Sequence, residues 1–186
     1  MKPNKSFIFS LVLLTIVAAL YRIIPGRPLG FAPQIAMAVF AGAVVKNKKW
    51  AFALPLISMV VSDILYQVLY ISGVSSIQGF YDGQLVNYLL FLLLVLIGFA
   101  VKKINLINVL LASVTAPTVY FILSNFMVWM GSGGWARPKT FSGLMWCYSD
   151  ALPFYQGSIE ATLIFSAIFF GTYLLINKKQ NAIATI

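Results

Sequence analysis

The chain has 186 residues, of which 61% are hydrophobic and only 9% are charged. Soluble domains carry about 25% charged residues, so this composition excludes an ordinary soluble fold and indicates an integral membrane protein. The formal net charge is +9, from 13 Lys and Arg against 4 Asp and Glu. The Lys residues stand in short clusters beside hydrophobic runs, which is typical of membrane topology signals and not of nucleic-acid binding.

The residue inventory excludes many kinds of chemistry. The chain has no His and a single Cys, Cys147. Catalytic triads and zinc-peptidase motifs that need His are therefore absent. One Cys forms neither an intrachain disulfide nor a thiolate cluster for a metal. We expect no catalytic residues, no metal site and no cofactor.

Six apolar runs follow one another along the chain, each close to the roughly 20 residues that a helix needs to cross a bilayer. Period-2 alternation is missing, so the runs predict helices and not the strands of a lipid-embedded barrel. The sequence thus predicts an all-α polytopic membrane protein, with residues 1–186 forming one membrane domain. The expected transmembrane helices cover residues 7–24, 29–45, 50–71, 85–101, 104–130 and 159–176.

The first run follows Lys2 and Lys5 and resembles a signal peptide with a possible cleavage site at Val17–Ala19. Because the run continues to Ile24, we favour a retained helix. Six crossings place nine Lys on one side of the membrane and four basic residues on the other. The nine are Lys2, Lys5, Lys46, Lys48, Lys49, Lys102, Lys103, Lys178 and Lys179, and the four are Arg22, Arg27, Arg137 and Lys139. The positive-inside rule then puts both termini in the cytoplasm.

A long aromatic loop is expected on the outer side, between the fifth and sixth helices, within the stretch from Asn125 to Glu160. Its rings include Trp129, Trp135, Trp146 and Tyr148. Aromatic residues within a connection favour a lid over a ligand, whereas rings at helix ends form a belt at the membrane surface. Both interpretations stay open, as does the role of Cys147, which is either a small buried residue or a reactive thiol.

Polar residues gather toward the outer ends of the expected helices. Asp63 lies inside the third helix, where a carboxylate is costly unless it faces the bundle or water, and Tyr66 and Gln67 share its helical face. The candidate substrate-binding residues are Asp63, Tyr66, Gln67, Asn87, Asn125, Trp129, Trp135, Trp146, Tyr148 and Glu160. The alternative is that these groups only hydrogen-bond between helices. Small residues four apart, as in Ala38/Gly42 and Ala112/Ala116, predict close helix packing.

The segments FAPQIAMAVFAGAVV, WAFALPLISMVVSDILY, NFMVWM and ARPKTFSGLMWCYSDALPFYQGSI resemble a bacterial family of uncharacterised six-helix membrane proteins. That family is similar in turn to the substrate-binding (S) components of energy-coupling-factor (ECF) vitamin transporters. The resemblance implies a six-helix bundle in the bacterial cytoplasmic membrane. It also implies a small-molecule ligand such as a vitamin, bound near the outer face, and a transmembrane coupling subunit with ATPases.

Two functions therefore follow from the sequence. The first is S-component-like binding of a small micronutrient from the outer face for uptake, with Asp63, Asn87 and Asn125 holding its polar groups. The alternative is a non-transporting scaffold or accessory subunit whose polar groups are structural. A third interpretation is a membrane enzyme that uses Asp63 and Asp150. No recognisable intramembrane-protease motif surrounds these two acids.

Overall fold

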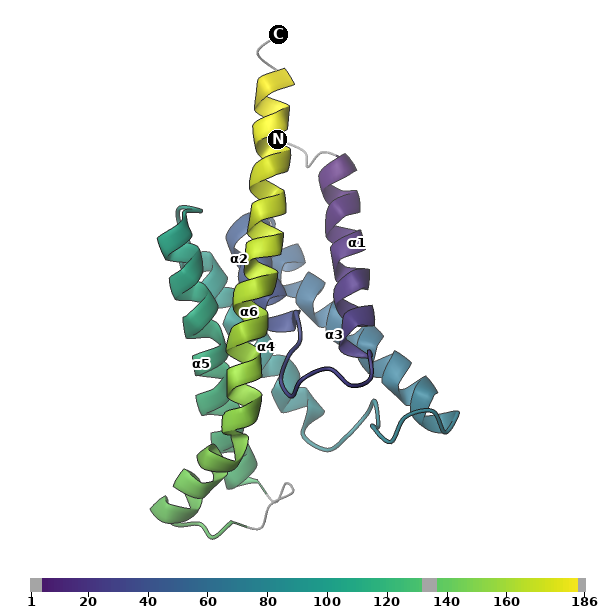
Figure 1. The fold of residues 1–186 in the computed structure, drawn as a ribbon, viewed down its shortest axis with the longest axis vertical. Helices are drawn as coiled ribbons and strands as arrows, with labels where there is room; N and C mark the ends of the chain where they lie inside the picture. Colours follow the sequence, from purple (N-terminus) through teal and green to yellow (C-terminus); the bar gives the residue numbers. More distant parts are fainter. Residues whose placement is uncertain (1–4, 132–136, 184–186) are drawn as a thin grey trace.

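The computed structural model describes residues 5–131 and 137–183, and within these ranges every regular element is a helix (Figure 1). The helices are α1 (Lys5–Arg22), α2 (Gln34–Val44), α3 (Lys48–Ile71), α4 (Gln84–Ala100), α5 (Leu106–Met130) and α6 (Phe141–Ile183). In Figure 1, α1 begins and α6 ends toward the top, whereas α1, α3 and α5 end toward the bottom. The all-α prediction is confirmed for the described residues.

Three of these helices are long and apolar enough to cross a membrane: Lys48–Ile71, Leu106–Met130 and Phe141–Ile176. The remaining helices are apolar but shorter over the described residues. The shortest is α2, whose 11 residues rise by about 16 Å at 1.5 Å per residue. That is roughly half of the ~30 Å of hydrocarbon in a bilayer. Three helices thus suit a membrane protein, whereas six spans, each of about 20 residues, were expected.

The side of α3 that is exposed on the surface of the helix bundle is apolar. Ile57, Val61, Ile64 and Val68 are all exposed, and their spacing of three or four residues puts them on one face of the helix. Ser58, Ser62 and the charged Asp63 lie buried in the protein interior. A helix on the surface of a soluble protein has the reverse pattern, with its polar face outward. This inversion is what contact with lipid requires.

The short helix α2 lies at the centre of the fold. It is buried along nearly its whole length and packs against α3, α4, α5 and α6. Gly42 of α2 faces Gly98 of α4 so closely that a Cβ on Gly42 would lie 2.8 Å from the Gly98 Cα. The predicted close packing at Gly42 is confirmed, and Ala112 and Ala116 of α5 are buried as well.

The predicted long aromatic loop is wrong, because α6 begins at Phe141 and not near residue 159. Gly143, Pro153 and Gly157 make this stretch resemble a connection. In the structure, the two glycines instead provide room for neighbouring backbone. A Cβ on Gly143 would collide with the carbonyl oxygen of Pro138, and one on Gly157 would collide with that of Leu29. Close backbone contacts, one of them to the connection between α1 and α2, therefore account for glycines that local propensity assigns to a loop.

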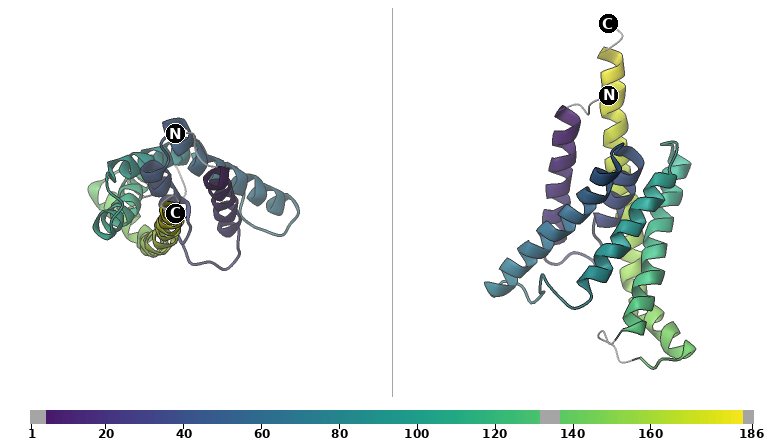
Figure 2. Two further views of the ribbon diagram at one scale, coloured as in Figure 1. Left: turned by 90° about the horizontal axis from the view of Figure 1, so that it is seen from above. Right: turned by 180° about the vertical axis from the view of Figure 1, so that it is seen from behind.

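Pro153 lies inside α6, and the first turns of α6 run at an angle to the rest of the helix (Figure 1). Proline removes a helical hydrogen bond and kinks a helix in this way. Seen from behind, α3 is also strongly tilted relative to α1 and α6 (Figure 2). The connection between α1 and α2 packs against α6, where Ser158 Oγ lies 3.2 Å from the carbonyl oxygen of Gly30.

The contact between Gly42 and Gly98 predicts the effect of one methyl group. Gly42→Ala forces α2 and α4 apart and should destabilise the protein by about 1–3 kcal/mol. Gly171→Ala is the matched control, because a Cβ there meets nothing within 4 Å and alanine favours the helix by up to ~1 kcal/mol. Thermal unfolding in detergent, followed by Trp fluorescence, measures both. Equal melting temperatures of the two variants would contradict the close packing.

Candidate functional site

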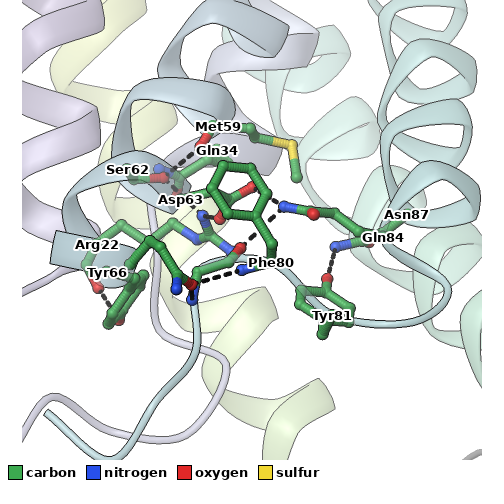
Figure 3. A network of polar contacts seen from close by, with 12 residues as sticks. Arg22, Gln34, Met59, Ser62, Asp63, Tyr66, Phe80, Tyr81, Gln84 and Asn87 are labelled. Carbon is green, nitrogen blue, oxygen red and sulfur yellow. Dashed lines mark hydrogen bonds and ion pairs between the residues drawn. The ribbon is translucent and has the colours of Figure 1, made fainter. Parts of the chain in front are cut away.

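A network of polar side chains joins α1, α3 and α4 around Asp63, whose exposed fraction is 1%. Asp63 Oδ1 forms an ion pair with Arg22 at the end of α1. Asp63 Oδ2 accepts hydrogen bonds from Gln84 Nε2 at 2.7 Å and from Tyr88 Oη at 2.6 Å. Arg22 and Gln84 converge on the carboxylate from opposite sides (Figure 3). Both carboxylate oxygens are thus occupied by donors of the protein itself.

Arg22 is held by further contacts on α3. Its Nη1 lies 2.6 Å from Ser62 Oγ, and Ser62 donates its own proton to the carbonyl oxygen of Met59 at 2.8 Å. The main-chain carbonyl oxygen of Arg22 accepts from Tyr66 Oη at 2.5 Å and from Arg27 Nε at 2.8 Å. These bonds satisfy a carbonyl at the end of α1 that has no partner within the helix.

Arg27 lies beside this network without a carboxylate partner among the described residues. Its Nη1 donates to the carbonyl oxygen of Phe31 at 3.1 Å, and its Nη2 lies 3.3 Å from Tyr66 Oη. A guanidinium has five N–H donors, so these bonds and the one from Nε leave two N–H groups unused. Since Asp63 balances only Arg22, the network carries one positive charge in excess.

The connection between α3 and α4 covers Asp63 and is fixed at Gly79. Gln67 Oε1 accepts from the main-chain nitrogen of Gly79 at 3.1 Å and from that of Phe80 at 3.4 Å. Gln84 Nε2 also donates to the carbonyl oxygen of Gly79 at 3.0 Å. A Cβ on Gly79 would collide with the backbone of Asp63. Only glycine therefore lets the connection lie this close to α3.

These elements enclose a pocket of about 450 Å³, which we call the Asp63 pocket. Its lining residues are Arg22, Arg27, Asp63, Tyr66, Ser76, Ile77, Gln78 and Tyr81. The volume is typical of small-molecule sites, which range over about 300–1,000 Å³. Desolvation raises the pKa of Tyr81 above its ordinary value of 10.0, so this phenol stays neutral. The pocket therefore offers a guanidinium and a phenol to a ligand.

Of the predicted site residues, only Asp63 and Tyr66 line the Asp63 pocket. Gln67 accepts a hydrogen bond from the connection between α3 and α4. Asn87 does not line the pocket but donates from Nδ2 to Oη of the lining residue Tyr81 at 2.9 Å. Asn125 lines a different pocket, between α5 and α6. Glu160 is exposed and accepts from Gln156 one helical turn away, at 3.1 Å. The predicted residues therefore do not form one site.

Three of the rings that were expected in a lid, Trp129, Trp146 and Tyr148, belong to α5 and α6 and do not line the Asp63 pocket. Trp129 Nε1 donates to the carbonyl oxygen of Pro138 at 3.0 Å, and Tyr148 Oη donates to that of Ile122 at 3.0 Å. Arg137 lies over the ring of Trp146, 5.7 Å from its centre. Trp135 lies outside the described residues. The aromatic side chains thus fix the join between α5 and α6.

Sequence reasoning missed Arg22, Arg27, Gln84 and Tyr88, which make most contacts of the network. The two arginines were used only to orient the membrane helices. A signal was present, because Arg22 and Asp63 were both assigned to the outer half of the membrane, where each charge needs a partner. Gln84 and Tyr88 lie one turn apart on α4, and nothing in their spacing points to Asp63.

Comparison with known proteins gives a family match over nearly the whole chain. The model of a family described as "Family of unknown function (DUF6580)" matches residues 2–183. No curated protein and no solved structure matches the chain. The geometry of the pockets is therefore the main guide to function.

The ion pair predicts how substitutions at Asp63 behave. Asp63→Asn leaves the Arg22 guanidinium without its counter-ion and should destabilise the protein by about 3–5 kcal/mol. Adding Arg22→Met removes the unpaired charge and should recover much of this loss. Asp82→Asn, which removes an exposed acid from the α3–α4 connection, serves as the control. Chemical unfolding in detergent measures all four proteins. A double variant no more stable than Asp63→Asn would show that the pair is not the cause.

Proposed function

We propose that this chain, which belongs to the DUF6580 family, binds a small micronutrient in the Asp63 pocket for uptake across a membrane. In this proposal the protein acts as the S components of ECF vitamin transporters do, holding its ligand near the outer face. The observation that carries the proposal is the pocket of about 450 Å³ beside a buried charge network. The ligand class follows from the charges.

A ligand with a carboxylate fits the Asp63 pocket best. Asp63 is paired with Arg22 and bonded to Gln84 and Tyr88, so it has little capacity left for a ligand. Arg27 has two unused N–H groups and no carboxylate partner among the described residues. A guanidinium binds a carboxylate through two parallel hydrogen bonds. The micronutrient therefore binds Arg27 through its acid group, with Tyr81 beside it.

The proposed topology has six crossings, with both termini in the cytoplasm of a bacterial cell. The nine Lys on one side and four basic residues on the other support it. The short α2 crosses together with the non-helical residues before it, which is tolerated at membrane depth only where protein surrounds the backbone. In this orientation the Asp63 pocket opens on the outer side. Transport would then need a transmembrane coupling subunit with ATPases.

A specific observation favours a second function, that of a scaffold or accessory subunit. Both oxygens of Asp63 accept hydrogen bonds from side chains of α1 and α4, and these bonds join α1, α3 and α4. A network built only to hold helices together has this form. The two functions differ in one testable respect, because a scaffold needs no ligand at Arg27.

Binding of matched pairs of vitamins tests the proposal. The panel contains nicotinate and nicotinamide, biotin and biotin methyl ester, and pantothenate and panthenol. We expect at least one acid to raise the melting temperature of the purified protein and its uncharged counterpart to have little effect. Arg27→Gln should weaken binding of that acid at least tenfold, because it removes the charge that the carboxylate meets.

Lys139→Gln is the matched control, since Lys139 is exposed and lies outside the Asp63 pocket. It should bind the acid as the wild type does. Native mass spectrometry of the purified protein adds a direct search for a bound acid. If no acid binds and none co-purifies, the proposal fails and the scaffold remains.

A further inference from the structure

A second pocket, of about 330 Å³, lies between α5 and α6, and we call it the α5–α6 pocket. It shares no lining residue with the Asp63 pocket. Four of its lining residues are aromatic: Tyr120, Phe121, Phe154 and Tyr155. The rings of Phe121 and Tyr155 stack with their centres 4.5 Å apart and an angle of 27° between their planes. Such walls suit a flat, apolar group.

The two tyrosine hydroxyls of this pocket use their protons within the protein. Tyr120 Oη donates to Asn87 Oδ1 at 2.5 Å. Tyr155 Oη lies 2.8 Å from Thr118 Oγ1, and Thr118 gives its own proton to the carbonyl oxygen of Val114 at 2.7 Å. Tyr155 is therefore the donor in its bond to Thr118. Both phenols can only accept a hydrogen bond from a ligand.

The smaller polar side chains of the pocket also donate their protons to acceptors within the protein. Ser158 Oγ donates to the carbonyl oxygen of Phe154 at 2.8 Å, and Ser124 Oγ and Cys147 Sγ point to main-chain carbonyl oxygens at 3.5 Å. Asn125 Nδ2 donates to the carbonyl oxygen of Phe121 at 2.7 Å. Among the described residues, one amide proton of Asn125 is then the only donor of the pocket side chains without an acceptor in the protein. The pocket is thus poor in donors.

Acceptors, in contrast, are available. Asn125 Oδ1 and Asp150 Oδ1 receive no hydrogen bond from the described residues. Arg137 binds only the other oxygen of Asp150, Oδ2, at 3.0 and 2.5 Å. Asp150 is the one charged side chain among the lining residues, and Arg137 is not one of them. The pocket therefore favours a ligand that donates hydrogen bonds, and a cationic donor would share the Asp150 carboxylate with Arg137 by binding its free oxygen, Oδ1.

We propose that the α5–α6 pocket binds a flat organic cation, an ammonium or amidinium group attached to an aromatic ring. The ring packs against the aromatic side chains that line the pocket, and the cationic N–H groups donate to Asp150 Oδ1 and Asn125 Oδ1. The two pockets thus take ligands of opposite charge, and this second site does not depend on the function proposed for the Asp63 pocket.

Three probes of one shape test the proposal: tryptamine, tryptophol and indole-3-acetate, which are cationic, neutral and anionic. Isothermal titration to the full-length protein in detergent measures their affinities. We expect tryptamine to bind saturably and at least tenfold more tightly than tryptophol, and indole-3-acetate to bind most weakly. Equal binding of tryptamine and tryptophol, or no saturable binding of tryptamine, overturns the proposal.

Variants locate the site. Asp150→Asn should weaken tryptamine binding at least tenfold, and Ala151→Phe should abolish it by filling the pocket. Asp82→Asn removes an exposed acid elsewhere and Arg27→Gln alters the Asp63 pocket, so both should bind tryptamine normally. Asp150 is exposed, and melting temperatures confirm that its variant folds. Unchanged binding to folded Asp150→Asn overturns the proposal, whereas loss of binding only in Arg27→Gln would place tryptamine in the other pocket.

Discussion

The ion pair between Arg22 and Asp63 is the interaction on which this architecture depends. It joins α1 to α3, and the Asp63 carboxylate also holds α4 through Gln84 and Tyr88. In an apolar environment neither charge is stable alone, so the helices that carry them must meet. The same bonds fix the end of α1 and the α3–α4 connection, which form the walls of the Asp63 pocket. Helix packing and pocket shape thus have one physical cause.

The two pockets differ in the hydrogen-bonding groups that the protein leaves unused. In the Asp63 pocket, two N–H donors of Arg27 are unused. In the α5–α6 pocket, the unused groups are acceptors, namely Asn125 Oδ1 and Asp150 Oδ1. Asn87 lies between the two sites. It donates to Tyr81, which lines the first pocket, and accepts from Tyr120, which lines the second. The Asn87 amide therefore determines that Tyr81 accepts a hydrogen bond and that Tyr120 donates one.

The sequence predicted the helical class, the burial of Asp63 and the close packing at Gly42, because these follow from composition and from the cost of isolated charges. It did not predict that residues 141–158 are helical, since Gly157 gives room to the distant backbone of Leu29, a contact that local patterns do not record. It also placed Asp63 and Asn125 in one site. Depth along a helix is readable from a sequence, but the direction in which a side chain points around the bundle depends on packing.

The bend of α6 at Pro153 has a consequence for motion. Residues that line the α5–α6 pocket stand on both sides of the bend: Cys147, Asp150 and Ala151 before it, and Phe154, Tyr155 and Ser158 at or after it. A proline kink lacks a backbone hydrogen bond that would resist flexing. Any change in the bend angle would therefore move one wall of the pocket relative to the other and alter the space for a ligand.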